Sequence, residues 1–410
     1  MTYNKAEDIS KNFCIMPWIG VATDPSGGIH PCCWMSLEDM YKGDIQEYQK
    51  SDYLNNLKTN FLEGKWPTAC ERCKASEENN LDSKRIRENY QWQNNKKGDW
   101  NNLPDEFQLI DLRLSNRCNL GCISCIPKSS SFIFKEMEKH GIAAFPKHHR
   151  SSFNFTKDND LINPYTDNDI DNLTNLIGKN SRIYITGGEP SLIKKVSALL
   201  HSLREKGYNK SVKLQFNSNF QAFNSDWVDL LKDFKGEMWP SLDGIGNTAE
   251  YVRYPCNWNR VETNLKRFIK ECPHWDIRIM PTVSILSIFN LLELHKWVFE
   301  ELVTDQSQIT NRKIRISVNN RLFQPKYLDI RNLPSELKDI ARKDLETIKE
   351  KYGQYESMFK YLDHVMSHLD IAPEIDFKET IDALERVDKI RKTDWKEIYP
   401  QIAKFLKETE

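Results

Sequence analysis

The stretch FQLIDLRLSNRCNLGCISC, residues 107–125, joins a predicted β-strand to three closely spaced cysteines. The strand candidate is the apolar run 107–115, and Cys118, Cys122 and Cys125 follow it in a loop. Small residues between the cysteines let this loop curl, so that three sulfur atoms can converge. Metal centres held only by protein thiolates or imidazoles ordinarily use four ligands. The spacing therefore predicts a metal centre that either takes a distant fourth ligand or leaves one position open.

Short apolar runs continue along the chain and alternate with amphipathic stretches. The further strand candidates are residues 182–186, 212–217, 237–243, 276–284 and 313–319. Predicted helices such as 191–207 and 260–272 lie between them, and parallel strands need such crossovers. We therefore predict an α/β fold, a partial (β/α)6 TIM-type barrel with its chemistry at the carboxyl ends of the strands. The polar stretch 127–180 is predicted to be a loop insertion over that face.

Changes in composition divide the chain into three predicted domains. Residues 1–100 contain five cysteines with many Trp and Asn, and they end in a polar linker at 93–102. Residues 105–330 carry the alternating strands and helices. Residues 331–410 are charged and helical in pattern, without alternating strands. We therefore expect an N-terminal Cys-rich domain, the barrel, and a C-terminal helical appendage.

Charge and hydropathy exclude several classes of partner. The chain has 58 Lys+Arg against 59 Asp+Glu, so no global field draws it to nucleic acid or to an anionic membrane. Residues 1–13 lack the apolar run of a signal peptide, and the most apolar helix candidate, 287–302, is interrupted by polar residues. The basic and aromatic stretch 84–97 is more typical of a solvated helix than of a nucleic-acid site. We expect a soluble, cytoplasmic protein.

In a reducing cytosol, close-spaced cysteines bind metal or do redox chemistry more often than they form disulfides. The chain has ten cysteines, and eight lie before residue 126. The other two, Cys256 and Cys272, stand alone, and isolated cysteines usually pack as small hydrophobes. Cys256 follows the SLDG turn at 241–244 and is the better candidate of the two for a functional role.

The amino-terminal cysteines form a separate set of four candidate ligands. They are Cys14, Cys32, Cys70 and Cys73, the last two as a C-x2-C knuckle. Gly27 and Gly28 predict a hairpin turn that brings Cys32 back towards Cys14. Neighbouring side chains of an extended strand point to opposite faces, so Cys33 is expected to face away from the ligand set. It would then pack in the interior or serve as an additional redox-active thiol. By spacing alone, this set favours a structural zinc site.

Three interpretations of the trio at Cys118, Cys122 and Cys125 compete. A zinc site needs a fourth ligand and usually pairs two C-x2-C knuckles. A reactive redox pair needs only two cysteines. An iron–sulfur cluster held by three thiolates leaves one iron open to a substrate or cofactor.

The loop with Cys118, Cys122 and Cys125 resembles the cluster-binding loop of a known family. The spacing C-x3-C-x2-C after the first strand of a β/α barrel is the signature of the radical S-adenosylmethionine (SAM) enzymes. TGGEP, residues 186–190, resembles the Gly-Gly-Glu motif of that family, and PSLDG, residues 240–244, resembles its peptide-modifying branch. The resemblance implies that Cys118, Cys122 and Cys125 hold a 4Fe–4S cluster whose open iron binds SAM.

The resemblance also assigns contacts to SAM. The implied residues are Gly187, Gly188, Glu189, Asn217, Ser241, Asp243 and Arg253. Glu189 would accept from the methionine ammonium, Ser241 would bond the ribose, and Arg253 would pair with the carboxylate. Plainer interpretations are a strand-to-helix turn with a prolyl start for TGGEP, and a surface ion pair for Arg253. Family members usually have an aromatic residue before the last cysteine, where this chain has Ser124.

Beside such a barrel, the amino-terminal cysteines resemble a twitch domain, the shorter relative of the SPASM domain. In a subset of radical SAM proteins this domain precedes the barrel, as the order here implies. The resemblance implies that the four cysteines bind one auxiliary 4Fe–4S cluster. Four thiolates close a cluster, so an electron-relay or structural role is favoured over substrate binding.

The resemblance implies an enzyme that reductively cleaves SAM to a 5′-deoxyadenosyl radical and abstracts hydrogen from a peptide or protein. SPASM and twitch relatives mostly modify peptides, and their electron comes from a reductant such as flavodoxin or ferredoxin. Two alternatives stay open: radical chemistry on a small molecule such as an aminosugar or nucleotide, and a non-enzymatic zinc or iron–sulfur interaction module. No residue can be singled out from the sequence for a further catalytic role.

Overall fold

The structure is a computed structural model, and the chain groups into two compact units. It describes residues 11–36, 39–79, 82–95, 106–151, 164–305, 307–311, 313–353 and 359–409. The first unit comprises Met1–Ser115, Asn163–Phe216 and Asp233–Lys235. The second comprises Asn116–Ile162, Asn217–Lys232 and Gly236–Glu410. Most of the predicted linker at 93–102 lies outside the described residues.

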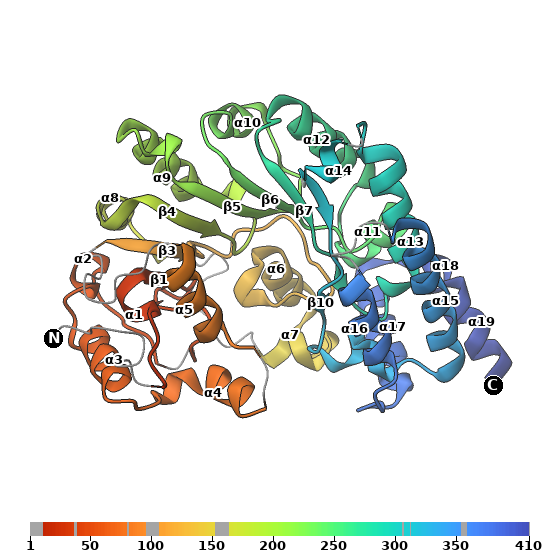
Figure 1. The fold of residues 1–410 in the computed structure, drawn as a ribbon. Helices are drawn as coiled ribbons and strands as arrows, with labels where there is room; N and C mark the ends of the chain where they lie inside the picture. The colour runs from red at the N-terminus through yellow and green to blue at the C-terminus, as the bar shows by residue number, and fades with distance from the viewer. Residues whose placement is uncertain are drawn as a thin grey trace. The chain divides into compact units, whose positions relative to one another are not determined.

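The first unit is built on strands in the order β2-β1-β3-β4-β5, of which Figure 1 labels β1, β3, β4 and β5. Their bounds are β1 Gly20–Thr23, β2 Ile29–His30, β3 Phe107–Leu112, β4 Ile177–Ile185 and β5 Lys213–Ser218. The β1–β3, β3–β4 and β4–β5 pairs are parallel, and in their register Asp111 lies opposite both Ala22 and Tyr184. Parallel strands end at the same edge, so the segments that follow β3 and β4 leave the sheet together.

A tight turn joins β1 to β2, and it follows from two glycines. The Gly27 N–H donates to Asp24 O and the Asp24 N–H donates to Gly28 O, both at 2.9 Å. Gly27 has φ +89°, a conformation that favours glycine. Ala22 lies opposite His30 in the antiparallel register. This confirms the hairpin predicted at Gly27 and Gly28.

Some helices of the first unit begin at side-chain caps, and others begin without one. They are α1 Met16–Ile19, α2 Ile45–Tyr48, α3 Asp52–Leu62, α4 Glu71–Glu78, α5 Lys84–Asn95, α8 Asp167–Leu176 and α9 Lys194–Glu205, with 3-10 turns η2 Thr68–Cys70, η6 Pro190–Leu192 and η7 Tyr208–Lys210. The Ser51 side chain caps α3, and Thr166 and Asp169 form a capping box at α8. The buried face of α9 carries Val196, Leu199, Leu200 and Leu203 at helical spacing.

The second unit repeats the alternation of strands and helices. The strands β6 Gly236–Pro240, β7 Asp276–Ile279 and β9 Ile314–Ile316 pair in parallel in that order, and β8 Thr282–Val283 pairs with β10 Asn320–Arg321. Its helices up to residue 310 are α6 Ser131–His140, α7 Lys147–Ser151, α10 Ser225–Leu231, α11 Gly246–Val252, α12 Trp258–Glu271, α13 Leu291–Lys296 and α14 Ser307–Thr310. Shorter segments are the 3-10 turns η3 Pro127–Ser129, η4 Ile142–Ala144 and η8 Ile288–Asn290 and the π-helical η9 Trp297–Leu302.

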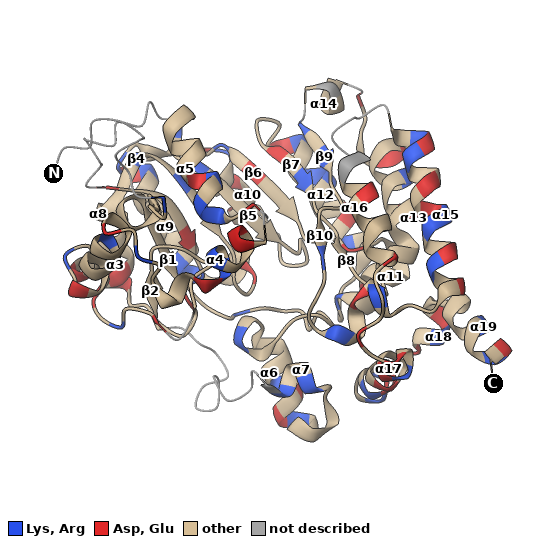
Figure 2. Cartoon of the chain, turned by 60° about the horizontal axis from the view of Figure 1, so that its bottom comes forward, with Lys and Arg blue, Asp and Glu red and all other residues tan. Residues whose placement is uncertain are grey.

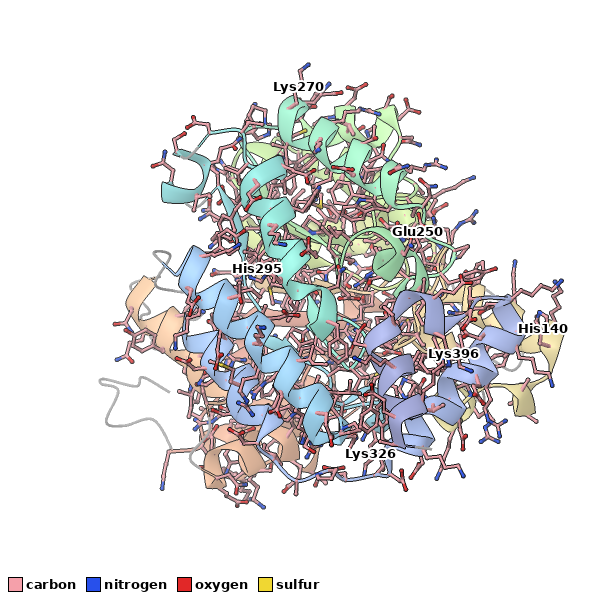
Figure 3. All side chains as sticks on the ribbon, turned by 90° about the vertical axis from the view of Figure 1, so that its right-hand side faces the viewer. His140, Glu250, Lys270, His295, Lys326 and Lys396 are labelled. Atoms are coloured by element: carbon pink, nitrogen blue, oxygen red, sulfur yellow. The ribbon has the colours of Figure 1, made fainter. Side chains whose placement is uncertain are left out.

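The chain ends in helices, drawn in blue in Figure 1. They are η10 Lys326–Leu328, η11 Ile330–Asn332, α15 Ser335–Tyr352, α16 Phe359–Leu369, α17 Phe377–Arg391, α18 Trp395–Ile398 and α19 Pro400–Thr409. Acidic and basic residues are interspersed along α15 and α17 (Figure 2). Lys326 and Lys396, labelled in Figure 3, are exposed, whereas His295 of α13 is fully buried. Within the described residues, no helix is long and apolar enough to cross a membrane.

The structure confirms a mixed α/β fold with mostly parallel strand pairing. A strand lies in each of the six predicted segments, β3, β4, β5, β6, β7 and β9. The expected loop at 127–180 is wrong where it is described, because α6, α7 and α8 form there. Buried Ile133, Phe134 and Met137 give α6 an apolar face despite the polar composition of the segment. Barrel closure and the division into three domains stay predictions.

Candidate functional site

The trio loop, residues 118–125, is held by backbone hydrogen bonds to residues far along the chain in the second unit. The Gly121 N–H donates to the Tyr254 carbonyl at 2.6 Å, and the Ile123 N–H donates to the Val252 carbonyl at 2.8 Å. These bonds place the loop against the end of α11. The Tyr327 hydroxyl also donates to the Ile123 carbonyl, at 3.4 Å.

Two serines at the start of α6 hold the other side of the trio loop. The Ser130 hydroxyl donates to the Leu120 carbonyl at 2.6 Å, and the Ser131 hydroxyl donates to the Cys118 carbonyl at 3.2 Å. Ser131 Oγ also accepts from the Cys118 N–H at 3.1 Å. These hydrogen bonds hold the loop in place through its own backbone.

Partial burial shifts the pKa of two thiols of this loop. Burial raises the pKa of Cys125 to about 12, and the neighbouring Cys122 adds to the rise. Burial also raises the pKa of Cys122, while Arg253 and Arg391 oppose that rise. Bound iron would deprotonate such thiols outright, because a metal competes with the proton. The Ser124 carbonyl lies 3.3 Å from His148 Nε2.

Arg253 and Asp243 form a buried ion pair beside the trio loop. Arg253 Nη2 lies 2.7 Å from Asp243 Oδ2, with the side chains only 16% and 3% exposed. Arg253 Nη1 lies 3.7 Å from Cys122 Sγ, and Asp243 Oδ1 accepts from the Thr282 N–H at 2.8 Å. Burial alone would lower the pKa of Arg253, but Asp243 and Cys122 raise it above its ordinary value. The surface ion pair considered from the sequence is wrong, because this pair is buried.

Asn217, near the end of β5, and Ser241, directly after β6, both fall within the second unit. The Ser241 N–H donates to the Ser218 carbonyl at 2.8 Å, and both residues belong to the second unit. Asn219 Nδ2 donates to Asn119 Oδ1 of the trio loop at 2.9 Å. Among the described residues, the buried polar atoms without a hydrogen-bond partner include Asn217 Oδ1 and Arg253 Nε. Such atoms suit a polar ligand like SAM, because burying them unpaired is unfavourable.

The Gly-Gly-Glu segment belongs to the first unit, where it follows β4. Gly187 and Gly188 have φ +84° and +57°, and a Cβ on Gly187 would lie 3.1 Å from Arg113 Cβ. Glu189 is 1% exposed, and its Oε1 accepts from the Ser191 hydroxyl at 2.8 Å. The prolyl turn predicted as the plainer interpretation is present as η6. The contacts of the Gly-Gly-Glu segment with SAM stay a prediction.

The four amino-terminal cysteines line one pocket of the first unit. The pocket is lined by Cys14, Met16, Pro17, Pro31, Cys32, Trp34, Met35, Phe61, Trp66, Cys70, Cys73 and Arg85. Three segments far apart in the sequence supply the cysteines, and most of the other walls are apolar. Burial raises the pKa of Cys70 to about 12, with Cys73 contributing. These residues fit an iron–sulfur cluster, which needs thiolates in a site that excludes water.

Cys33 does not line this pocket and lies in a polar cluster instead. Lys84 Nζ donates to Cys33 Sγ at 3.1 Å. A hydrogen bond from Cys32 and the Lys84 charge hold the pKa of Cys33 below its ordinary value. Burial, together with Cys33, raises the pKa of Asp111 to about 7. Cys33 faces away from the pocket as expected, but it lies in a turn after β2, not on a strand, and its contacts are polar.

The structure also places the two isolated cysteines. Cys272 is 1% exposed and packs in the core, as predicted. Cys256 Sγ accepts from Gln221 Nε2 at 3.6 Å, and burial raises the pKa of Cys256 to about 12. In the described part of the chain, no group of three or more His, Cys, Asp or Glu side chains is placed as a ready site for a metal ion. Both ligand sets therefore stay predictions.

Sequence reasoning missed the residues that hold the trio loop. Tyr254 and Val252 act through backbone carbonyls, which carry no sequence signal. Arg391 comes from the last turn of α17, and its partner Glu136 lies 255 residues earlier. No local motif could have joined such distant positions.

No family model matches the sequence, and no curated protein matches it. Among solved structures, the chain is similar to anSMEcpe with bound AdoMet and Cp18Cys peptide, at 13% identity over 60% of this chain and 61% of that chain, with a TM-score of 0.37. It is similar to Streptococcus suis SuiB bound to S-adenosylmethionine, at 16% identity over 85% and 71%, with a TM-score of 0.36. It is also similar to Streptococcus suis SuiB bound to precursor peptide SuiA, at 17% identity over 72% of this chain and 58% of that chain, with a TM-score of 0.36.

The chain thus spans less than two thirds of the length of the anSMEcpe structures that it matches. These likenesses are distant in sequence and in structure. The assignment of chemistry to this chain rests on its own residues.

Proposed function

We propose that the chain is a radical SAM enzyme that modifies a peptide or protein. The observation that carries the proposal is the separation of the cysteines into two sets with different surroundings. Four cysteines line one pocket of the first unit, and the trio sits in a loop of the second unit beside a buried ion pair. Because the set of four is complete in itself, it does not supply a fourth ligand to the trio.

In this proposal Cys118, Cys122 and Cys125 hold a 4Fe–4S cluster. With SAM bound, that cluster supplies the reductive cleavage that yields a 5′-deoxyadenosyl radical, which abstracts hydrogen from the substrate. The chain's own part is to bind and orient SAM. Arg253 and Asp243 present a guanidinium and a carboxylate to a zwitterionic ligand, and Asn217 Oδ1 offers a buried acceptor.

Arg253 differs from the role implied by the sequence resemblance in one respect. Its Nη2 is already paired with Asp243, and its Nη1 faces Cys122. Its Nε has no hydrogen-bond partner within the described structure. We therefore propose that Arg253 and Asp243 act together, orienting the trio and presenting two opposite, fixed charges to SAM.

The four-cysteine pocket would hold the auxiliary cluster. Cys32 lines it and Cys33 does not, which favours Cys32 as the ligand. Four thiolates close a cluster, so we propose electron relay or a structural role for it. The Gly-Gly-Glu segment would supply Gly187, Gly188 and Glu189 to SAM, with flavodoxin or ferredoxin as the reductant.

Anaerobic reconstitution followed by iron, sulfide and zinc assays tests the proposal. Two 4Fe–4S clusters predict about eight irons per chain. The assay for 5′-deoxyadenosine, with SAM and with or without dithionite, should show release only with the reductant. Zinc without SAM cleavage would contradict the proposal and favour the interaction module. A peptide and a small-molecule substrate are distinguished by which one increases 5′-deoxyadenosine release and gains a product.

A further inference from the structure

The C-terminal helices reach the trio loop at Tyr327 of η10 and at Arg391, the last residue of α17. Arg391 Nη2 lies 2.8 Å from Glu136 Oε2, and its Nε lies 3.2 Å from Glu136 Oε1. The two side chains are 3% and 11% exposed. This two-point geometry fixes the guanidinium plane, so Arg391 holds one orientation between α17 and α6.

The Arg391 guanidinium packs directly on the backbone beside Cys122. A Cβ added to Gly121 would lie 2.8 Å from Arg391 Nη2, 2.9 Å from the Phe132 ring and 3.1 Å from Glu136 Oε2. Arg391 Cζ also lies 5.0 Å from the ring centroid of Tyr254, whose carbonyl accepts from Gly121. The glycine between Cys118 and Cys122 is thus the place where this charge pair approaches the loop.

The end of α17 is itself fixed, so this contact is not a loose one. The Tyr251 hydroxyl of α11 donates to Asp388 Oδ1 at 2.9 Å. Asp388 also accepts from the Thr393 hydroxyl at 2.6 Å and from the Trp395 N–H at 2.7 Å. Asp388 lies one helical turn before Arg391, so α11 and α18 hold the turn that carries the guanidinium.

We propose that Arg391 and Glu136 are a positioning pair that sets the reduction potential of the cluster at Cys118, Cys122 and Cys125. This rests on the proposed function, since it requires a cluster there. Reducing the cluster adds negative charge, which a buried cation favours and a buried anion opposes. Removing the charge of Arg391 therefore makes the potential more negative, and removing that of Glu136 makes it more positive.

The test compares full-length, reconstituted Arg391→Gln, Arg391→Lys and Glu136→Gln with wild type. A potentiometric titration followed by electron paramagnetic resonance gives the potential of the trio cluster. A triple variant with Cys118, Cys122 and Cys125 changed to Ala supplies the auxiliary signal for subtraction. Arg331→Gln is the matched control, because Arg331 is another largely buried arginine of the C-terminal helical segment, paired with Asp329 and Glu374.

Opposite shifts in Arg391→Gln and Glu136→Gln, with Arg391→Lys and Arg331→Gln close to wild type, support the inference. A purely structural pair would give the same loss of thermal stability in both variants and no opposite shifts in potential, and that result would overturn it. Glu136→Gln and Arg391→Lys keep the test open if Arg391→Gln does not fold. A wild type without a cluster at the trio would instead refute the proposed function, and this inference with it.

Discussion

The two cysteine sets are held in opposite ways. The set of four lines a pocket whose walls are mainly Met, Pro, Phe and Trp, and its cysteines come from separate segments of the first unit. The trio comes from one short loop, which backbone hydrogen bonds hold in place. Charged groups lie beside this loop, and Arg253 Nη1 lies 3.7 Å from Cys122 Sγ. An apolar pocket suits a cluster that passes electrons, whereas a loop beside an ion pair suits one that binds a charged cofactor.

The largest effect is expected from a substitution that removes a ligand of the trio and leaves the set of four intact. Cys122→Ala removes one of three proposed ligands and should reduce release of 5′-deoxyadenosine to background. The auxiliary site should keep its cluster, so about four irons per chain remain. Iron assay and chromatography of the adenosine product check this. Cys272→Ala, in the core, is the control variant and should keep both clusters. Wild-type release from Cys122→Ala would contradict the assignment.

Breaking the set of four should separate the two roles. Cys73→Ala should lose about four irons yet still release 5′-deoxyadenosine with dithionite, because SAM binds at the other cluster. Turnover of the substrate should fall, since electron relay is lost. Cys33→Ala is the neighbouring control and should keep all eight or so irons, because Cys33 lies outside the pocket. If Cys33→Ala lost iron and Cys32→Ala did not, the ligand assignment would be reversed.

The buried ion pair gives the next effect in size. Asp243→Asn leaves Arg253 buried without its partner, and removal of one partner of such a pair costs about 3–5 kcal/mol. Urea unfolding of the protein without clusters measures this cost. Glu408→Gln, which breaks the exposed pair of Lys404 and Glu408, should cost less than about 0.5 kcal/mol. Equal costs for the two variants would show that the Asp243 pair does not order the trio loop.

How much the sequence predicted depended on the range of the interactions. The strands and the hairpin at Gly27 follow from local apolar patterns and turn residues, and the structure contains them. The strand β1, which is short and pairs with β3 far along the chain, left no such pattern. The contacts of Lys84 with Cys33 and of Arg391 with Glu136 join positions 51 and 255 residues apart. Only the fold brings such side chains together, so a single sequence could not show them.

The smallest expected effect is a pH dependence near the trio loop. His149 is 1% exposed, and burial, followed by His148 and Arg391, lowers its pKa to about 3. His149 binds a proton below about pH 6.5 in the unfolded chain but stays neutral in the folded chain until about pH 3. Its contribution to the free energy of unfolding is therefore fully present above about pH 6.5 and falls on acidification towards pH 3. The slope should be about 1.4 kcal/mol per pH unit in this window.

His149→Phe should remove this contribution, which urea unfolding at pH 7, 6 and 5 measures as a difference from wild type. The control is His201→Phe, which makes the same substitution at an exposed position of α9. The same slope in wild type and His149→Phe would show that His149 is not buried neutral beside the loop.

The most direct test of the central claim is the electron paramagnetic resonance spectrum of each reduced cluster with and without SAM. Cys73→Ala isolates the trio cluster, and Cys122→Ala isolates the auxiliary one. If only the trio has an open iron, SAM should change the spectrum of Cys73→Ala and leave that of Cys122→Ala unchanged. A SAM-dependent change in Cys122→Ala, or none in Cys73→Ala, would contradict the account.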